Sequence, residues 1–492
     1  MNIIKILENN SQNKKSNKTF IFYNNKKYSF KTIFNLIKNT CNLFYKLNLK
    51  QNDRITLFLE NSVEFVILYF ASMRYGLVVN PSPVYLSRKD VINNLNQIKP
   101  KYIFCSNNFN FLKKNRLYKN KAYVIKDENN FLNEINKLKK EKKIKKFNYE
   151  NIAVLYYSSG STGKSKLIKM SHRAIYNSQK MQQSSTLKKS GNNHLCILPL
   201  AHTSSLRSTL KFCAFNQRTV FLYKNFWTIK SSILDIIDKH KISFVQTVPS
   251  ILSMLSSIYS QNLEIHNKIK TLKFVATGSS YLSKDVADKF MNTFNVPIIN
   301  IYGLSETCAL TMTKYEDKEF ILNSVGNILP GIKYKLTNNN KNCKIGEAGE
   351  LSVKTPSIFS GYYGKNSKNV KKNNYFKTGD IFTKDDKGFL YYIERKKNII
   401  IKSGINISAK EIDDIVLNSK LVKDTFTTSM KDIFHGEVPI TYIVPKKKYK
   451  LNILENYCRK NLGDFKVPSF FKVLKKIPRS PTGKIQFSLL EK

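Results

Sequence analysis

Short apolar runs alternate with amphipathic stretches over much of this sequence, which leaves few arrangements open to the chain. The runs that resemble buried strands are residues 76–80, 102–105, 153–157, 195–198, 244–247, 274–276 and 298–302. The stretches that resemble helices are residues 63–75, 231–240, 250–257 and 283–294. Strand and helix in alternation predict an α/β fold with a mostly parallel sheet, covered by helices on both faces.

The pattern changes after about residue 325, where segments such as GELSV, TGDIF and GFLYY follow one another. They predict a smaller β-rich module that closes the α/β part. A strand–loop–helix pattern begins again after Arg395, so we expect residues 1–394 and 395–492 to form separate domains. The charged run at 137–146 is expected to be a linker or a surface helix.

The net charge is unusual. Subtracting 34 Asp and Glu from 83 Lys and Arg leaves +49, a value that ordinarily suggests a polyanionic partner. Only ten of the basic residues are Arg, however, and the Lys residues are scattered. AT-rich codons supply Lys, Asn and Ile, whereas nucleic-acid sites rely on Arg for bidentate contacts. Drift in codon composition therefore accounts for the charge, and we expect no specific nucleic-acid partner.

The cysteines and the apolar runs bear on where the protein works. Seven widely spaced cysteines without a CxxC pair argue against a disulfide framework or a zinc site, and for a reducing compartment. The apolar stretch at the N-terminus is too short for a signal peptide, and no run approaches the roughly 18 apolar residues of a membrane span. We expect a cytoplasmic protein with no membrane span.

The strongest local signal for chemistry is residues 157–166, YSSGSTGKSK. These small residues follow a predicted strand, so hydroxyls and backbone N–H groups are free to surround an anion, and glycine permits the close approach that this needs. The spacing differs from that of the P-loop, because Gly160 and Gly163 are only three residues apart. A plain surface turn is the alternative, but the position directly after a buried strand favours phosphate binding.

Four more segments fit the same kind of site. Residues 300–306, NIYGLSE, place an aromatic ring, a hydroxyl and a carboxylate at the end of a strand, where ligands bind in parallel α/β sheets. A carboxylate there suits Mg²⁺. Residues 378–380, TGD, offer a carboxylate for a ribose diol, and Arg395 follows ahead of residues 403–404. Residues 478–484, PRSPTGK, form a rigid turn that presents one lysine.

In this order, the segments resemble the adenylate-forming (AMP-binding) superfamily, which includes acyl-CoA synthetases, the adenylation domains of peptide synthetases and firefly luciferase. The resemblance extends from about residue 19 to residue 484. It implies a large N-terminal domain of parallel-rich sheets with a small β-module, which binds ATP and the acyl substrate. It also implies a small, mobile α+β C-terminal domain that carries the catalytic lysine.

The resemblance implies that the loop at 158–166 lies over the β- and γ-phosphates of ATP. Its expected ligands are Ser158, Ser159, Gly160, Ser161, Thr162, Gly163 and Lys166, with Thr162 also taking part in catalysis. The sequence departs from the family pattern at Ser165, where Pro is usual, and at Leu167, where Gly often follows the lysine. Both changes should alter the stiffness of the loop without removing a ligand.

The other segments take their implied roles in the same way. Tyr302, followed by Gly303, stacks on adenine, Ser305 contacts the α-phosphate, Glu306 holds Mg²⁺, and Asp380 binds the ribose hydroxyls with help from Arg395. Lys484 reaches the carboxylate and the α-phosphate from the C-terminal domain. That domain is expected to rotate about Lys397, after which residues 401–407, with Ser403 and Gly404, line the tunnel for the pantetheine of CoA.

The expected chemistry needs fixed positive charge rather than a protein nucleophile, because a carboxylate must attack a polyanionic phosphate. Mg²⁺ and a well-placed lysine supply that charge in phosphate transfer generally. Adenylation releases pyrophosphate and leaves an acyl-AMP, from which a thiolate then displaces AMP. The implied cofactors are ATP and Mg²⁺, with coenzyme A as the acceptor.

The substrate pocket is expected beside residues 199–202, PLAH, where CoA ligases carry an aromatic or histidine gate, here His202. No Asp lies between residues 199 and 224 to bind an α-ammonium, which favours a simple carboxylate over an amino acid. By family analogy, the pocket is expected to be formed by Pro249, residues 276–280 with Gly278 and Ser279, and residues 308–310 with Cys308 as an inert filler. Arg207 could meet a second carboxylate, although a surface or pocket-rim position is the expectation.

The sequence therefore predicts an ATP-dependent carboxylate–CoA ligase, an acid–thiol ligase of the acyl-CoA synthetase type. Three alternatives stay open. The acyl group could be loaded onto the phosphopantetheine of an acyl carrier protein, or the substrate could be an amino acid. A protein of a different class would be a non-catalytic, basic binder of polyanions, which the presence of Lys166, Glu306, Asp380, Arg395 and Lys484 argues against.

Overall fold

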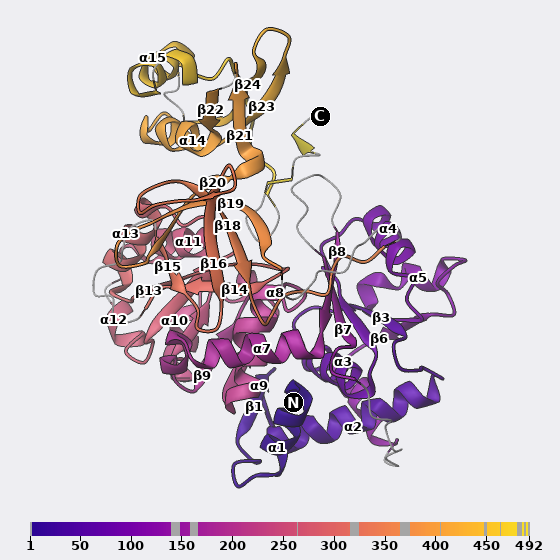
Figure 1. The fold of residues 1–492 in the computed structure, drawn as a ribbon. Coiled ribbons are helices and arrows are strands. Elements are labelled where there is room, and N and C mark those ends of the chain that lie inside the picture. The colour runs from indigo at the N-terminus through magenta and orange to yellow at the C-terminus, as the bar shows by residue number, and fades with distance from the viewer. Residues whose placement is uncertain are drawn as a thin grey trace.

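Three β-sheets form the framework of the protein, each with helices packed against it (Figure 1). The computed structural model describes residues 2–138, 148–157, 166–262, 264–314, 324–364, 374–403, 405–446, 450–462, 464–479, 485–486 and 489–490. Within these residues the sheets have six, fourteen and five strands. The mixed α/β architecture with a small C-terminal module confirms the fold class predicted from the sequence.

The six-stranded sheet has the order β6-β5-β3-β4-β7-β8 and is parallel except for β8. Its strands are β3 (Arg54–Phe58), β4 (Val78–Pro81), β5 (Tyr102–Ser106), β6 (Ala122–Ile125), β7 (Ile152–Tyr157) and β8 (Leu167–Ser171). Helices that belong to this part include α2 (Phe30–Lys46), α3 (Val63–Tyr75), α4 (Arg88–Ile98) and α6 (Glu128–Asn136). Parallel pairing buries both faces of a sheet, as the apolar runs predicted.

Helix α3 lies in the interior, and its two ends are set by local chemistry. The Ser62 hydroxyl accepts a hydrogen bond from the backbone N–H of Phe65 (3.2 Å) at the start. Gly76 ends the helix with φ at +84°, a conformation that glycine adopts without a steric penalty. Because α3 is apolar on all sides, it packs among several elements rather than on one face.

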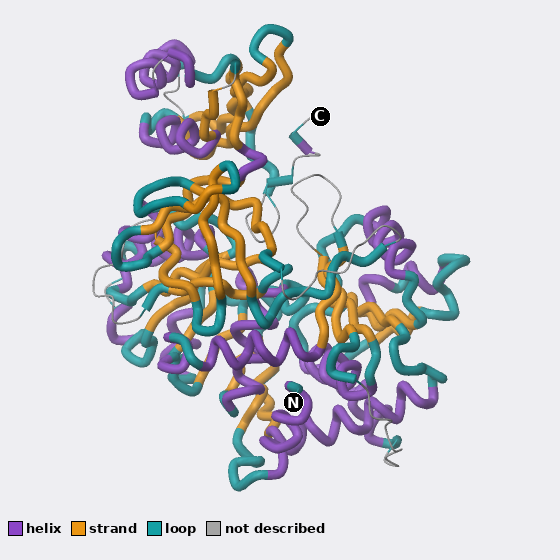
Figure 2. The backbone as a smooth tube through the Cα atoms, viewed as in Figure 1, coloured by secondary structure: helices purple, strands orange, loops and turns teal. Residues whose placement is uncertain are grey.

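The fourteen-stranded sheet contains a parallel half and an antiparallel half. Figure 2 shows the strands in orange and the helices around them in purple. The parallel neighbours are β13 (Ile298–Leu304), β12 (Phe274–Gly278), β11 (Phe244–Gln246), β9 (Asn193–Cys196), β10 (Thr219–Leu222) and β1 (Thr19–Tyr23), with β2 (Lys26–Ser29) antiparallel at the edge. The antiparallel half continues from β13 through β14 (Cys308–Met312), β15 (Ser324–Ile328), β20 (Leu390–Arg395), β19 (Phe376–Lys384), β18 (Gly349–Lys354), β16 (Lys333–Asn338) and β17 (Lys341–Asn342). Helices near the parallel half include α7 (His172–Gln183), α10 (Ile233–Lys239), α11 (Pro249–Tyr259) and α13 (Lys284–Phe294).

The C-terminal module lies at one end of the molecule, next to β20 (Figure 1). Its sheet has the order β22-β21-β24-β23, with β25 pairing in parallel with β24. The elements are β21 (Ile399–Lys402), β22 (Ile405–Ser408), α14 (Ala409–Asn418), β23 (Val422–Asp432), β24 (Gly436–Pro445), α15 (Leu451–Leu462) and β25 (Phe470–Val473). One short 3₁₀ turn, Lys396–Asn398, joins β20 to β21.

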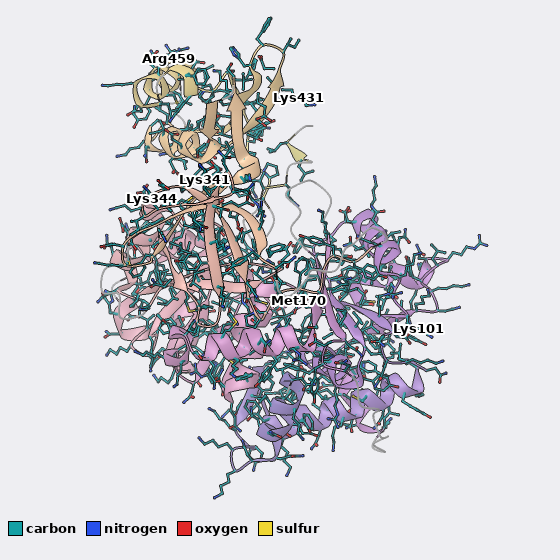
Figure 3. All side chains as sticks on the ribbon, viewed as in Figure 1. Lys101, Met170, Lys341, Lys344, Lys431 and Arg459 are labelled. Carbon is teal, nitrogen blue, oxygen red and sulfur yellow. The ribbon has the colours of Figure 1, made fainter. Side chains whose placement is uncertain are left out.

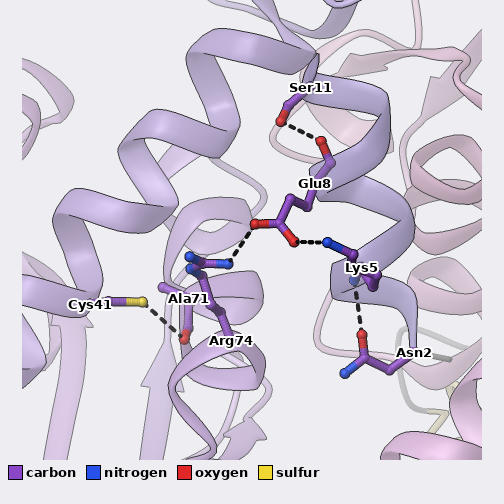
Figure 4. Close-up of polar contacts among 7 residues, drawn as sticks. All are labelled: Asn2, Lys5, Glu8, Ser11, Cys41, Ala71 and Arg74. Atoms are coloured by element: carbon purple, nitrogen blue, oxygen red, sulfur yellow. Dashed lines mark hydrogen bonds and ion pairs between the residues drawn. The ribbon is translucent and has the colours of Figure 1, made fainter. Parts of the chain in front are cut away.

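Glu8 of the N-terminal helix α1 (Ile3–Gln12) forms ion pairs within α1 and with α3 (Figure 4). Glu8 accepts from Lys5 Nζ at 2.9 Å and from Arg74 of α3 at 3.5 Å. The side chain of Asn2 caps the helix by accepting from the N–H of Lys5 (2.9 Å). These contacts place α1, which the sequence analysis did not predict, against the main core.

Most of the predicted elements occur close to their expected positions. Residues 63–75 coincide with α3. The largest shift is that of the strand predicted at residues 195–198, because β9 covers Asn193–Cys196 and residues 197–198 form a buried connection. All seven cysteines carry free thiols, as predicted. Residues 139–147, most of the charged run, lie outside the described residues.

Basic side chains occur on separate parts of the molecule. Figure 3 shows Lys101 on the six-stranded part, Lys341 and Lys344 on the antiparallel half, and Lys431 and Arg459 on the C-terminal module. Within the described residues, no helix combines the length and the apolar character that crossing a membrane requires.

We predict that acid weakens the fold through two buried histidines. Burial lowers the pKa of His172 to about 4 and that of His194 to about 3. Both rings are neutral in the folded chain but bind protons near pH 6.5 when unfolded, so stability is lost as pH falls below 6.5. Each ring contributes a slope of at most about 1.4 kcal/mol per pH unit. Urea unfolding between pH 5 and 7 measures this slope.

His194→Gln should reduce the slope, whatever it does to the midpoint at neutral pH. His266→Gln is the matched control, because His266 is exposed on the surface. An equal slope in the wild type and the His194→Gln variant would contradict the prediction.

Candidate functional site

A cavity of about 230 Å³ lies where the carboxyl ends of β11, β12 and β13 meet the antiparallel half of the sheet. Neighbouring parallel strands end at the same edge, which is where ligands bind in α/β sheets. The residues lining it are His202, Thr203, Ser204, Arg207, Gln246, Gly278, Ser279, Ser280, Tyr281, Leu282, Asn300, Ile301, Tyr302, Gly303, Leu304, Ser305, Glu306, Val325, Asp380, Tyr392 and Arg395. Nine of the predicted site residues are therefore brought together: His202, Gly278, Ser279, Tyr302, Gly303, Ser305, Glu306, Asp380 and Arg395.

Two glycines let the strands around the cavity approach closely. A Cβ atom on Gly303 would lie 2.0 Å from the carbonyl oxygen of Cys308, across the turn between β13 and β14. A Cβ atom on Gly278 would lie 2.4 Å from the carbonyl oxygen of Ile301. These contacts are with backbone, which cannot move aside as a flexible side chain would, so a side chain at either position would force the strands apart.

Tyr302, Asp380 and Arg395 form a hydrogen-bonded group on one side of the cavity. The Tyr302 hydroxyl donates to Asp380 Oδ2 at 2.7 Å, and Arg395 Nε lies 3.4 Å from Asp380 Oδ1. Asp380 is buried, and burial raises the pKa of Tyr302 well above its ordinary value. The phenol therefore stays protonated and keeps its donor role. Its ring meets Phe382 edge to face at 4.9 Å.

Glu306 presents a carboxylate to the same cavity. The Tyr362 hydroxyl donates to Glu306 Oε1 at 3.0 Å, and Lys166 Nζ lies 5.1 Å from the centre of the Tyr362 ring. Burial raises the pKa of Tyr362, which keeps that donor protonated. The described residues hold no cluster of three or more His, Cys, Asp or Glu side chains with metal-site geometry. One carboxylate nevertheless fits Mg²⁺, which is commonly bound through one or two carboxylates together with substrate phosphates.

His202 lies at the start of a short helix, α8 (Thr203–Ser205), on another side of the cavity. Its Nδ1 is 2.7 Å from the Ser204 hydroxyl, a contact that orients the ring. The hydroxyl of Thr203, which lies between His202 and Ser204 in the sequence, is 3.3 Å from Ser305 Oγ. This contact connects the helix to the end of β13. His202 and Ser305 therefore face one space although they are far apart in the sequence.

Arg207 differs from the sequence expectation. It was expected at the surface or on the rim of a pocket, but it lines the cavity and only 7% of its surface is exposed. The segment that carries it, Leu206–Lys211, is a π-helix that continues from α8. Pro249 and residues 308–310 do not line this cavity: Pro249 is the first residue of α11, and Cys308 interacts with Arg207.

Several predicted residues cannot be assigned to the cavity. Residues 158–165, Gly404 and Lys484 lie outside the described part of the chain, and the side chain of Lys397 is not described. The backbone of Lys397 lies in the turn between β20 and β21. Ser403 lies in the C-terminal module, where its hydroxyl is 2.9 Å from His435 Nδ1, and it does not line the cavity.

The sequence analysis missed two tyrosines at the mouth of the cavity. Lys410 of α14 lies 3.6 Å from the centre of the Tyr281 ring, and Tyr281 lies 6.4 Å from Tyr392. Glu394 accepts from the N–H of Lys410 at 2.9 Å and from the hydroxyl of Ser408. No motif signals these residues, because the contact of Lys410 with Tyr281 arises only when the C-terminal module is placed against β20.

The sequence profile of the AMP-binding enzyme family matches residues 7–363, which is most of the chain. The chain belongs to the AMP-binding enzyme family. The profile of the AMP-binding enzyme C-terminal domain matches residues 411–484. The geometry at Tyr302, Glu306, Asp380 and Arg395 is consistent with this membership, because these four side chains face one cavity.

Similar proteins include two curated relatives and two solved structures. The 2-succinylbenzoate–CoA ligase of Bacillus pumilus is 25% identical over 95% of this chain and 93% of its own length. Luciferin 4-monooxygenase of Photuris pensylvanica is 27% identical over 92% and 88%. ATP-bound MatB from Rhodopseudomonas palustris superposes with a TM-score of 0.89 at 21% identity, covering 100% of this chain and 98% of that one. The o-succinylbenzoate CoA synthetase MenE of Bacillus subtilis, in complex with its acyl-adenylate, gives a TM-score of 0.85 at 24% identity and covers 99% and 98%.

We predict that Asp380→Asn weakens binding of AMP at least about tenfold, because hydrogen bonds to a charged group each contribute about 1.5–3 kcal/mol. The change keeps the shape of the side chain but removes its charge. Calorimetric titration with AMP measures the affinity.

Asp385→Asn is the matched control in the turn between β19 and β20, where Asp385 accepts from the Tyr391 hydroxyl at 2.8 Å and does not line the cavity. Equal affinities for the two variants would contradict a nucleotide site at Asp380.

Proposed function

We propose that this protein is an ATP-dependent carboxylic acid–CoA ligase, which first forms an acyl-AMP and then an acyl-CoA thioester. The observation that carries the proposal is the single cavity joining Tyr302, Asp380 and Arg395 to Glu306 and His202. The residues proposed to bind the nucleotide therefore face the residue proposed to lie beside the acid, across one cavity. The similarity to a 2-succinylbenzoate–CoA ligase over most of both chains supports the same reaction class.

The proposed nucleotide site extends from adenine to the phosphates. Tyr302 and Gly303 contact adenine, and Asp380 with Arg395 binds the ribose hydroxyls. Ser305 contacts the α-phosphate, while Lys166 and the loop at 158–163 contact the β- and γ-phosphates. The support for these roles is the resemblance at each motif, together with the hydrogen bonds around Asp380.

In the first half-reaction, a carboxylate oxygen of the acid attacks the α-phosphorus of ATP and pyrophosphate leaves. Glu306 would hold Mg²⁺, which would supply positive charge near the phosphates when bound. Lys484 binds the carboxylate and the α-phosphate, Thr162 assists from the phosphate loop, and His202 lies beside the carboxylate. Such fixed cations contribute mainly by offsetting the repulsion between the carboxylate and the phosphate, which allows the two anions to come together.

In the second half-reaction, the thiolate of CoA attacks the carbonyl carbon of the acyl-AMP and AMP leaves. We propose that residues 395–492 act as a separate domain that turns about Lys397, and that Ser403 and Gly404 then line the path of the pantetheine. The single turn at Lys396–Asn398 and the few polar contacts made by Lys410 and Glu394 support such a rotation.

The proposal extends to the acceptor of the acyl group and to the location of the protein in the cell. CoA is the proposed acceptor, and the phosphopantetheine of an acyl carrier protein is the alternative, since both present the same thiol. The free thiols of all seven cysteines are consistent with a reducing, cytoplasmic location.

The experiment that tests the function is pyrophosphate release with Mg²⁺-ATP across a panel of carboxylic and amino acids, with and without CoA. We expect release with a carboxylic acid, faster with CoA and accompanied by a thioester. Release that responds only to a phosphopantetheinylated carrier protein would establish the alternative acceptor. No release with any acid, from folded protein, would overturn the proposal.

A second prediction concerns the catalytic lysine. Lys484→Ala should reduce acyl-AMP formation by at least about a hundredfold, because the transition state loses a fixed charge, while the affinity for ATP changes little. Lys476→Ala, at an exposed position nearby in the sequence, is the control. Comparable adenylation rates in the two variants would remove Lys484 from the mechanism.

A further inference from the structure

Two positive side chains lie in the interior beside the cavity, on one turn of the π-helix Leu206–Lys211. Arg207 is 7% exposed and Lys211 is 3% exposed. They are four residues apart, and a π-helix has slightly more than four residues per turn, so they point to the same side. π-Helical turns are frequent at functional sites.

Neither cation has an acidic partner among the described residues. Lys211 Nζ donates to the Tyr156 hydroxyl at 3.2 Å, and Arg207 interacts with Cys308 while its Nε has no hydrogen-bond partner. Burial raises the pKa of Tyr156 well above its ordinary value, so the phenol stays protonated. Burial lowers the pKa of both cations, to about 8 for Lys211. Two positive charges therefore lie side by side with no negative charge from the described protein to offset them.

Arg218 shows how the same chain satisfies a buried guanidinium when no ligand is involved. Its Nη1 donates to the carbonyl of Leu187 at 3.2 Å and to the hydroxyl of Ser190, and its Nη2 donates to the carbonyl of Lys188 at 2.6 Å. Arg218 does not line the cavity, whereas Arg207 does. The difference indicates that Arg207 can take a further hydrogen-bond partner at Nε, one that no described residue supplies.

Gln246 adds a second unsatisfied polar group to this part of the cavity. It is 2% exposed, it lines the cavity at the end of β11, and its Oε1 has no hydrogen-bond partner within the described residues. A purely alkyl acyl group would leave Nε of Arg207 and Oε1 of Gln246 without hydrogen-bond partners, which is costly for buried polar atoms. A carboxylate would accept from the Arg207 guanidinium, whereas Gln246 Oε1, itself an acceptor, needs a donor such as a hydroxyl of the substrate or an ordered water.

We infer that the acid activated by this protein carries a second carboxylate, which binds the guanidinium of Arg207 while Lys211 provides further positive charge behind it. The inference rests on the proposed function and names the class of substrate, a dicarboxylic acid. The triphosphate is a less suitable partner of Arg207, because the phosphates are proposed to lie near Lys166 and Glu306. Lys166 lies over the ring of Tyr362, and the Tyr362 hydroxyl donates to Glu306. Arg207 instead follows His202 on one continuous helical segment, on the acid side of the cavity.

The test compares each dicarboxylic acid with its monomethyl ester, which keeps the length and removes one charge. The panel contains the straight-chain diacids from malonate to suberate, 2-succinylbenzoate, and matched monocarboxylic acids. Pyrophosphate release gives KM and kcat for the acid and for ATP. We expect the wild-type protein to prefer one diacid over its ester at least about tenfold in kcat/KM.

Arg207→Met should remove that preference by raising the KM for the diacid, with the KM for ATP within about twofold of the wild type. Arg207→Lys should restore part of the preference, which a merely structural role would not do. Arg173→Met is the surface control, since Arg173 pairs with Glu150 and does not line the cavity. Circular dichroism and thermal protection by the diacid, without ATP, are measured for each variant.

The outcomes separate the two proposals. Wild-type activity with monocarboxylic acids at least equal to that with every diacid would overturn the dicarboxylate inference while leaving the ligase intact. A rise in the KM for ATP equal to that for the acid in Arg207→Met would assign Arg207 to the nucleotide and also overturn it. No release with any acid would overturn the ligase, and thermal protection by a diacid that is lost in Arg207→Met would then still support the Arg207 site.

Discussion

The close approach of neighbouring parallel strands is the constraint on which the site depends. β11, β12 and β13 run side by side, and their carboxyl ends deliver Gln246, Gly278 and Tyr302 to one edge of the sheet. At Gly278 the neighbouring backbone comes so near that only a hydrogen atom fits. Because backbone hydrogen bonds hold these strands in register, the cavity has a rigid floor before any ligand is bound.

The Tyr302–Asp380–Arg395 group connects the two halves of the large sheet. Tyr302 belongs to the parallel half, whereas Asp380 and Arg395 face each other on the antiparallel pair β19 and β20. Arg395 is also the last residue of β20, directly before the turn that leads to the C-terminal module. The same few side chains therefore shape the cavity and determine where the second module starts.

Much of this arrangement can be predicted from local sequence. The strand ends at residues 300–306 and 378–380 carry residue types that make sense only together, and α3 is bounded by a serine cap and a glycine that are visible in the sequence. Arg207 could not be placed in this way. Its segment, TSSLRSTLK, is polar with no clear periodicity, so a surface position was the reasonable expectation. In the folded chain Arg207 is buried and interacts electrostatically with Cys308 and Tyr156, which come from distant strands.

The contact of Lys410 with Tyr281 was equally hidden from sequence analysis, for a different reason. Tyr281 lies in the connection between β12 and α13, Lys410 lies in α14, and only the placement of one module on the other brings Lys410 Nζ within 3.6 Å of the centre of the Tyr281 ring. Contacts between modules depend on tertiary geometry rather than on propensity, so no local pattern records them.

The two glycines at the strand ends also limit how this sequence can change over time. Codons for glycine are rich in G, so a genome that accumulates A and T tends to replace glycine wherever the protein tolerates it. We expect the same pressure to favour lysine at exposed positions, where a side chain meets no such contact. At Gly303 any other residue would bring a Cβ within 2.0 Å of the Cys308 carbonyl oxygen, so mutational bias stops at this position. This edge of the sheet is thus less open to nucleotide bias than the exterior.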